Sequence, residues 1–113
     1  MSRKDQILSL LEDSPHDPFL RFALAKEYEK EGAAAGATPG AWQQAKQVYE
    51  QLIQDSPDEP GTYYHLGKLL EQLGEPLAAD RIYAQGIAKT KALGEQHAMR
   101  ELMGARMELG LEG

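Results

Sequence analysis

The sequence predicts an all-α protein built as a solenoid of helix-turn-helix repeats. The main observation is a repeat at an offset of 34 residues, in which Ala45-x3-Tyr49 recurs as Ala79-x3-Tyr83. A second observation is the spacing of the apolar residues, which follows the helical period and gives no convincing strand. A third is the presence of capping residues followed by proline, which is typical of helix starts. Repeats of this length stack so that each unit buries its apolar face against its neighbours.

Apolar spacing and end signals divide the chain into six helices. The second helix opens at Asp17-Pro18, a capping residue followed by a proline whose missing N–H costs nothing there. Gly32 is expected to end this helix, because glycine tolerates the left-handed turn that often follows a helix. Pro60 and Pro76 open the fourth and fifth helices in the same way. The predicted helices cover about residues 3–13, 17–32, 39–55, 59–73, 75–92 and 95–109.

The first repeat is longer than the second. Leu10-Leu11 before one Asp-Ser-Pro sequence matches Leu52-Ile53 before another at an offset of 42, which is 8 residues more than the standard repeat. The interval after Gly32 is rich in alanine and glycine, and this places the insertion at about 33–40. We expect residues 33–39 to be mobile and dispensable, because they hold no large apolar anchor.

These repeated segments resemble the tetratricopeptide repeat family. The matching first-helix motifs are Arg21-x2-Leu24-Ala25-x2-Tyr28, Tyr63-x2-Leu66-Gly67-x2-Leu70 and Arg100-x2-Met103-Gly104-x2-Met107. The resemblance covers nearly the whole chain and implies a single tetratricopeptide-like domain over residues 1–113. It implies an α-α superhelix of about six antiparallel helices: a partial repeat, a long repeat with the insertion, a standard repeat and a C-terminal capping helix. The chain departs from the family pattern where arginine replaces the first aromatic residue, at Arg21 and Arg100.

The motif residues have a packing role. Small side chains stand where helix axes approach to about 8–10 Å. They are Ala25, Ala45, Gly67, Ala79 and Gly86. Tyr49 and Tyr83 are expected to fill the space between neighbouring repeats.

Composition excludes several classes of function. A net charge of −6 opposes non-specific attraction to nucleic acid or to an anionic membrane. The absence of cysteine excludes disulfides and thiolate metal sites. The N-terminal residues do not form a signal peptide, and no run approaches the roughly 20 apolar residues of a membrane span. A cytoplasmic location is therefore expected.

No catalytic, metal or cofactor site is predicted. His16, His65 and His97 do not share the spacing of paired ligands on one helical face. Asp13 and Asp17 lie beside His16, but aspartates at helix ends are usually caps. The sequence therefore does not favour an enzyme.

A candidate binding surface lies on the first helices of the repeats. Phe19, Phe22, Lys26 and Glu29 share one helical face, and Tyr64, Lys68 and Glu71 repeat the last three of these positions 42 residues later. In tetratricopeptide proteins these positions line the peptide-binding groove, so the resemblance implies partner-binding residues here. The alternative is that Phe22 and Tyr64 pack on adjacent helices. Some family members bind the C-terminal carboxylate of a chaperone through paired lysines and asparagines. Because this chain has no asparagine, that activity is not expected here.

The last helix carries Met99, Met103 and Met107. We expect Ala98, Met99, Leu102 and Met103 to face inward, and Glu95, Arg100, Glu101, Arg106 and Glu108 to face solvent. Methionine fills irregular gaps in a core, and the alternative is an exposed contact stripe.

Two functions from different classes follow. The first is an adaptor that binds a peptide or a partner helix in its concave groove. The second is an assembly subunit that self-associates through its terminal helix. We expect a monomer at micromolar concentration, because the last helix offers a polar outer face.

Overall fold

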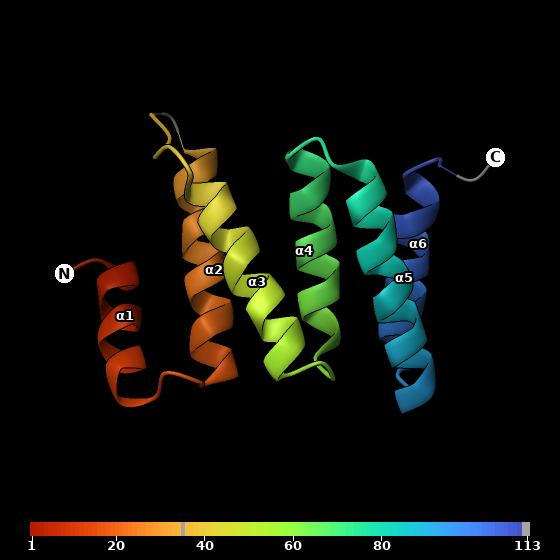
Figure 1. The fold of residues 1–113 in the computed structure, drawn as a ribbon, viewed down its shortest axis with the longest axis horizontal. Coiled ribbons are helices and arrows are strands. Elements are labelled where there is room, and N and C mark those ends of the chain that lie inside the picture. Colours follow the sequence, from red (N-terminus) through yellow and green to blue (C-terminus); the bar gives the residue numbers. More distant parts are fainter. Residues whose placement is uncertain (35, 112–113) are drawn as a thin grey trace. The chain divides into compact units, whose positions relative to one another are not determined.

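The computed structural model describes residues 1–34 and 36–111, and the described part is all-α (Figure 1). The helices are α1 (Arg3–Asp13), α2 (Pro18–Ala33), α3 (Ala41–Asp55), α4 (Pro60–Gln72), α5 (Pro76–Leu93) and α6 (Gln96–Glu108). The predicted fold class is confirmed, and each predicted helix is present with ends that differ by two residues at most. The chain forms two compact units, an N-terminal unit of residues 1–54 and a C-terminal unit of residues 55–113.

The helix ends follow the signals in the sequence. The Asp17 carboxylate accepts hydrogen bonds from the backbone N–H groups of Phe19 and Leu20, at 2.9 and 3.2 Å. Because these N–H groups have no partner inside the helix, the cap fixes the first turn of α2. Gly94 follows α5 in the left-handed conformation, with φ of 74°, and the next N–H, of Glu95, donates to the Thr90 carbonyl at 2.9 Å. This arrangement satisfies carbonyl groups at the end of the helix.

Gly32 does not end α2, which corrects the prediction from the sequence. The helix continues to Ala33, and Gly32 lies inside it. A Cβ atom on Gly32 would lie 2.1 Å from Cδ1 of Trp42, so the indole of α3 occupies the space that a side chain would need. The Trp42 Nε1–H also donates to the Glu29 carbonyl at 3.2 Å. Glycine is therefore required by the contact between α2 and α3.

The predicted insertion at 33–40 joins α2 to α3. Its first residue, Ala33, belongs to α2, and Ala35 lies outside the described residues. The Thr38 N–H donates to the Glu31 carbonyl at 3.2 Å, which ties the segment before α3 to the last turns of α2. The mobility of residues 33–39 stays a prediction.

The core of each unit combines large residues with small ones. The buried apolar residues of the N-terminal unit are Ile7, Leu24, Ala25, Ala41, Ala45, Tyr49 and Leu52. Those of the C-terminal unit are Tyr63, Leu66, Leu69, Leu70, Ala79, Tyr83, Leu102 and Ala105. A Cβ atom on Gly67 would lie 2.1 Å from Cε1 of Tyr83, and one on Gly86 would lie 2.7 Å from Cβ of Tyr63. The packing role of these small residues is therefore confirmed in the C-terminal unit.

The last helix is rotated relative to the prediction from its sequence. Leu102 and Ala105 are its buried residues, whereas Met103 is 44% exposed. Arg106 was expected to face solvent, but its Nε donates to Oδ1 of Asp80 on α5 at 2.8 Å. The inward expectation for Met103 and the outward expectation for Arg106 are therefore wrong. The carboxylate on α5 explains the second error, because it gives the guanidinium a partner on the packed side of α6.

Within the described residues, no helix is both long enough and apolar enough to cross a membrane.

Candidate functional site

Two equivalent clusters contain most of the residues that the sequence singled out. The N-terminal cluster consists of Phe22, Lys26 and Glu29 on α2 with Tyr49 on α3. The C-terminal cluster consists of Tyr64, Lys68 and Glu71 on α4 with Tyr83 on α5. Each cluster lies within one unit, and the helical period brings its three first-helix residues to one face.

In the N-terminal cluster, the aromatic residue packs inward. The Phe22 ring meets the Tyr49 ring edge-on, with 5.8 Å between centroids and an interplanar angle of 62°. This is a favourable geometry for two aromatic rings. The Tyr49 hydroxyl donates to Oε2 of Glu29, and Nζ of Lys26 lies 3.5 Å from the same oxygen. Phe22 therefore packs on the adjacent helix α3, which was one of the two alternatives for this residue.

In the C-terminal cluster, the aromatic residue lies beside the lysine. Nζ of Lys68 lies 5.7 Å from the centroid of the Tyr64 ring, within the range of a cation–π contact. The same Nζ lies 3.9 Å from Oε2 of Glu71 and 3.8 Å from Oε2 of Glu108. The Tyr83 hydroxyl donates to Glu71, which repeats the bond between Tyr49 and Glu29.

The two buried tyrosines hold the carboxylates in place. Burial raises the pKa of Tyr49 above its ordinary value, and the hydrogen bond to Glu29 raises it further. Burial and the hydrogen bond to Glu71 raise the pKa of Tyr83 in the same way. Each hydroxyl therefore stays protonated at neutral pH and remains a donor to a carboxylate on the first helix. Sequence reasoning missed this link, although the repeat spacing of Tyr49 and Tyr83 was visible.

Phe19, the remaining candidate, lies one turn before Phe22 and is 84% exposed. Aromatic side chains are enriched where proteins bind partners, so Phe19 remains a candidate contact.

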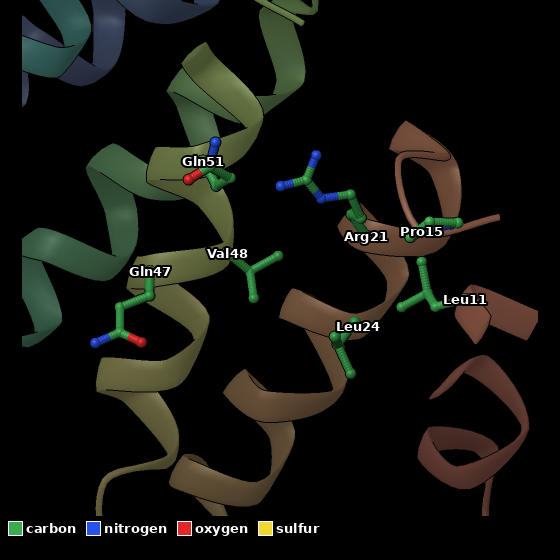
Figure 2. A pocket seen from close by; sticks show the side chains of 7 residues that line it. All are labelled: Leu11, Pro15, Arg21, Leu24, Gln47, Val48 and Gln51. Atoms are coloured by element: carbon green, nitrogen blue, oxygen red, sulfur yellow. The ribbon is translucent and has the colours of Figure 1, made fainter. Parts of the chain in front are cut away.

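A hollow in the N-terminal unit was not predicted. It has a volume of about 320 Å³ and is shown in Figure 2. Its lining residues come from α1 and its following loop, α2 and α3, and are Leu11, Pro15, Arg21, Leu24, Gln47, Val48 and Gln51. Arg21 stands where the second repeat has Tyr63, which is buried and donates its hydroxyl to the Pro57 carbonyl at 2.6 Å. The replacement of that aromatic residue by arginine was the available signal for a different surface here.

The acidic and histidine residues within 1–34 and 36–111 form no cluster suited to a metal centre. Among the described residues, no group of three or more His, Asp or Glu side chains could hold a metal ion. Asp17 caps α2, and His97 pairs with Glu101 on the surface of α6 at 3.2 Å.

Comparison with known proteins identifies the family. No family model matches the chain, and no curated protein matches it. The chain is similar to a tetratricopeptide repeat domain protein from Salinibacter ruber solved by NMR in solution, with 40% identity and a TM-score of 0.75, over 87% of this chain and 92% of that one. It is also similar to a crystal structure of a tetratricopeptide repeat domain protein from Salinibacter ruber, with 40% identity and a TM-score of 0.70, over 85% of this chain and 99% of that one. With this identity over nearly the full length of both structures, the chain belongs to the tetratricopeptide repeat family.

Proposed function

We propose that this protein is an adaptor whose first-helix clusters bind a peptide segment or a helix of a partner protein. Tetratricopeptide repeat domains generally mediate protein–protein interactions. The observation that carries the proposal is the repetition of one cluster in both units, with an aromatic residue, a lysine and a tyrosine-bound glutamate at matching positions. A surface repeated in both units offers a partner two equivalent sets of contacts. The proposal places the protein in the cytoplasm, as a monomer at micromolar concentration, and gives it no catalytic role.

The chemistry of the clusters indicates the kind of partner. Lys26 and Lys68 lie 3.5 and 3.9 Å from the neighbouring glutamates, farther than the roughly 2.7–2.9 Å of a direct charge-assisted hydrogen bond. The Lys68 ammonium is partly exposed and both of its glutamate contacts are long, so it can turn toward an incoming carboxylate. Phe19 offers exposed aromatic surface on α2, and the Tyr64 ring lies beside Lys68. The partner segment we expect is amphipathic, with an apolar anchor and acidic residues.

The proposal is tested with two synthetic amphipathic peptides of equal length. One carries leucine anchors and glutamates, and the other has lysine in place of each glutamate. We expect the 113-residue protein to bind the acidic peptide and to discriminate against the basic one, as measured by fluorescence anisotropy. Because exposed charges are screened, the affinity should fall as salt is added. Equal binding of both peptides, or of neither, would contradict the proposal.

Variants then locate the binding surface. Tyr64→Ala and Lys68→Glu should each weaken binding of the acidic peptide by at least about 1 kcal/mol and leave thermal unfolding nearly unchanged, because aromatic and cationic anchors dominate small interfaces. Arg81→Glu is a matched control, since Arg81 is an exposed basic residue on α5 outside the clusters. Phe22→Ala should reduce both binding and stability, because Phe22 packs on Tyr49. Binding that survives the double variant Tyr64→Ala/Lys68→Glu but is lost in Met107→Glu would move the site to α6.

A further inference from the structure

The outward side of α6 is an uncovered face with apolar and charged residues. It consists of Arg100, Met103, Gly104, Met107 and Glu108, and we call it the α6 outer face. Met103 and Met107 are 44% and 68% exposed. The opposite side of α6 carries Leu102 and Ala105, which are buried in the C-terminal unit. The outer face therefore does not contribute to the core of the described chain.

Gly104 at the centre of this face makes no close helix contact among the described residues. It lies in the interior of α6 with no positive φ, and a Cβ atom there would meet nothing within 4 Å among the described residues. The equivalent position in α4 is Gly67, whose missing Cβ makes room for the Tyr83 ring. Glycine destabilises a helix interior relative to alanine, so its presence at an exposed position needs another reason. Close approach of a second helix is such a reason.

The charges on the outer face are arranged symmetrically about Gly104. Arg100 lies four residues before it and Glu108 four residues after it, each about 6 Å away along the helix axis. Two copies of α6 that cross antiparallel at Gly104 would place Arg100 of one copy opposite Glu108 of the other. Twofold symmetry repeats this pair on the other side of the crossing. The face is therefore complementary to itself.

The contacts that Arg100 and Glu108 already make are too weak to prevent an ion pair with a second copy. Glu108 is near Lys68, with Nζ and Oε2 3.8 Å apart, but its side chain is 75% exposed. Exposed pairs at this distance contribute little to stability. Within the described residues Arg100 is exposed and has no ion pair. Both charged groups can therefore turn toward a second copy.

We propose that α6 is a self-association site, at which a second copy of this chain docks its own α6 antiparallel across Gly104. The exposed side chains of Met103 and Met107 flank the crossing and adapt readily to a partner surface. One pair of short helices buries less than the roughly 1,200 Å² of a standard interface, so the dimer is transient. This face adjoins the C-terminal cluster, because Glu108 also lies 3.8 Å from Nζ of Lys68.

The first test is sedimentation equilibrium of the 113-residue protein from roughly 10 µM to 1 mM, the range suited to a weak dimer. We expect a monomer at the low end and a growing fraction of dimer at the high end. Gly104→Leu should weaken dimerisation at least about tenfold, because the side chain separates the helix backbones. Gln85→Leu, at an exposed position of α5, is the matched control and should dimerise like the wild type. A protein that is monomeric at every concentration, or a Gly104→Leu variant that dimerises normally, would overturn the proposal.

The second test uses charge reversal and does not depend on a single variant. Arg100→Glu and Glu108→Arg should each lose at least about tenfold in dimerisation, because each places like charges opposite one another twice. An equimolar mixture of these two variants should recover the dimer, since every charge pair across the antiparallel crossing is then opposite in sign. The control variant Arg81→Glu should dimerise normally. A mixture that stays monomeric would rule out the antiparallel crossing at Gly104.

Discussion

Replacing Gly67 with alanine tests the packing of the C-terminal unit with the smallest change available. The new Cβ atom would lie 2.1, 2.6 and 2.7 Å from three atoms of the Tyr83 ring. Real Cβ atoms do not approach other heavy atoms so closely, so the ring or the helix must move. Tyr83 is buried and its hydroxyl is bound to Glu71, which leaves the ring little freedom to turn aside.

The expected size of the effect follows from three contributions. Alanine is better than glycine in a helix interior by about 0.8–1.0 kcal/mol, and this favours the variant. Overpacking costs about 1–3 kcal/mol. A weakened hydrogen bond from Tyr83 to Glu71 costs roughly a further 0.5–1.5 kcal/mol. The net loss in the free energy of unfolding should therefore be about 1–3 kcal/mol for Gly67→Ala, and larger for Gly67→Leu.

Urea unfolding followed by circular dichroism measures this loss. Gly104→Ala is the matched control, because Gly104 is also inside a helix but has open space around it. At low protein concentration, where the monomer prevails, Gly104→Ala should gain about 0.5–1 kcal/mol. Both variants replace glycine with alanine, yet they should change the free energy of unfolding in opposite directions. If Gly67→Ala is as stable as the wild type, the close contact between α4 and α5 is not a constraint and the reasoning fails.

Three further predictions concern the tyrosines, the loop and the helix cap. Burial raises the pKa of Tyr49 and Tyr83 in the folded protein. Their contribution to the free energy of unfolding should therefore be complete below about pH 10, the pKa of tyrosine in the unfolded chain. Above that pH the free energy of unfolding should fall by about 1.4 kcal/mol per pH unit for each tyrosine, because only the unfolded state loses the proton. Tyr83→Phe should make this decline shallower in alkaline urea titrations, and an unchanged slope would contradict the assignment. Replacing residues 33–39 with the shorter linker sequence of residues 73–75 should change the free energy of unfolding by no more than about 1 kcal/mol, since halving a loop alters closure entropy by only about 0.6 kcal/mol. Strong protection of the backbone amides of the native segment from hydrogen exchange would count against its predicted mobility. Asp17→Ala should cost about 1 kcal/mol in thermal unfolding through the lost cap of α2, whereas no loss would mean that the two hydrogen bonds are not stabilising.

The sequence predicted the helices well because their signals are local. A cap such as Asp17, a proline in the first turn, and the apolar period act within a few residues of each helix end. The small residues at Gly67 and Ala79 were also identified, because the repeat compares equivalent positions directly. These inferences needed no knowledge of how one helix lies against another.

The errors concern contacts between helices. Gly32 has the appearance of a helix stop, and only the position of the Trp42 ring reveals why it lies inside α2. The faces of α6 depend on how the helix is rotated about its axis, which the Arg106–Asp80 contact helps to fix. Glycine can serve a turn or a close contact, and an arginine can face solvent or a carboxylate, so residue type alone does not decide these cases.

The single tryptophan of the chain gives a separate optical probe of one unit. Trp42 lies over Gly32 and donates to the Glu29 carbonyl, so its fluorescence reports whether α2 and α3 remain packed. Circular dichroism reports the helices of the whole chain. In repeat proteins, stability is approximately a sum of the stability of each repeat and the coupling between neighbours. A difference between the fluorescence and circular dichroism midpoints would therefore measure how strongly the unfolding of the N-terminal unit is coupled to that of the C-terminal unit.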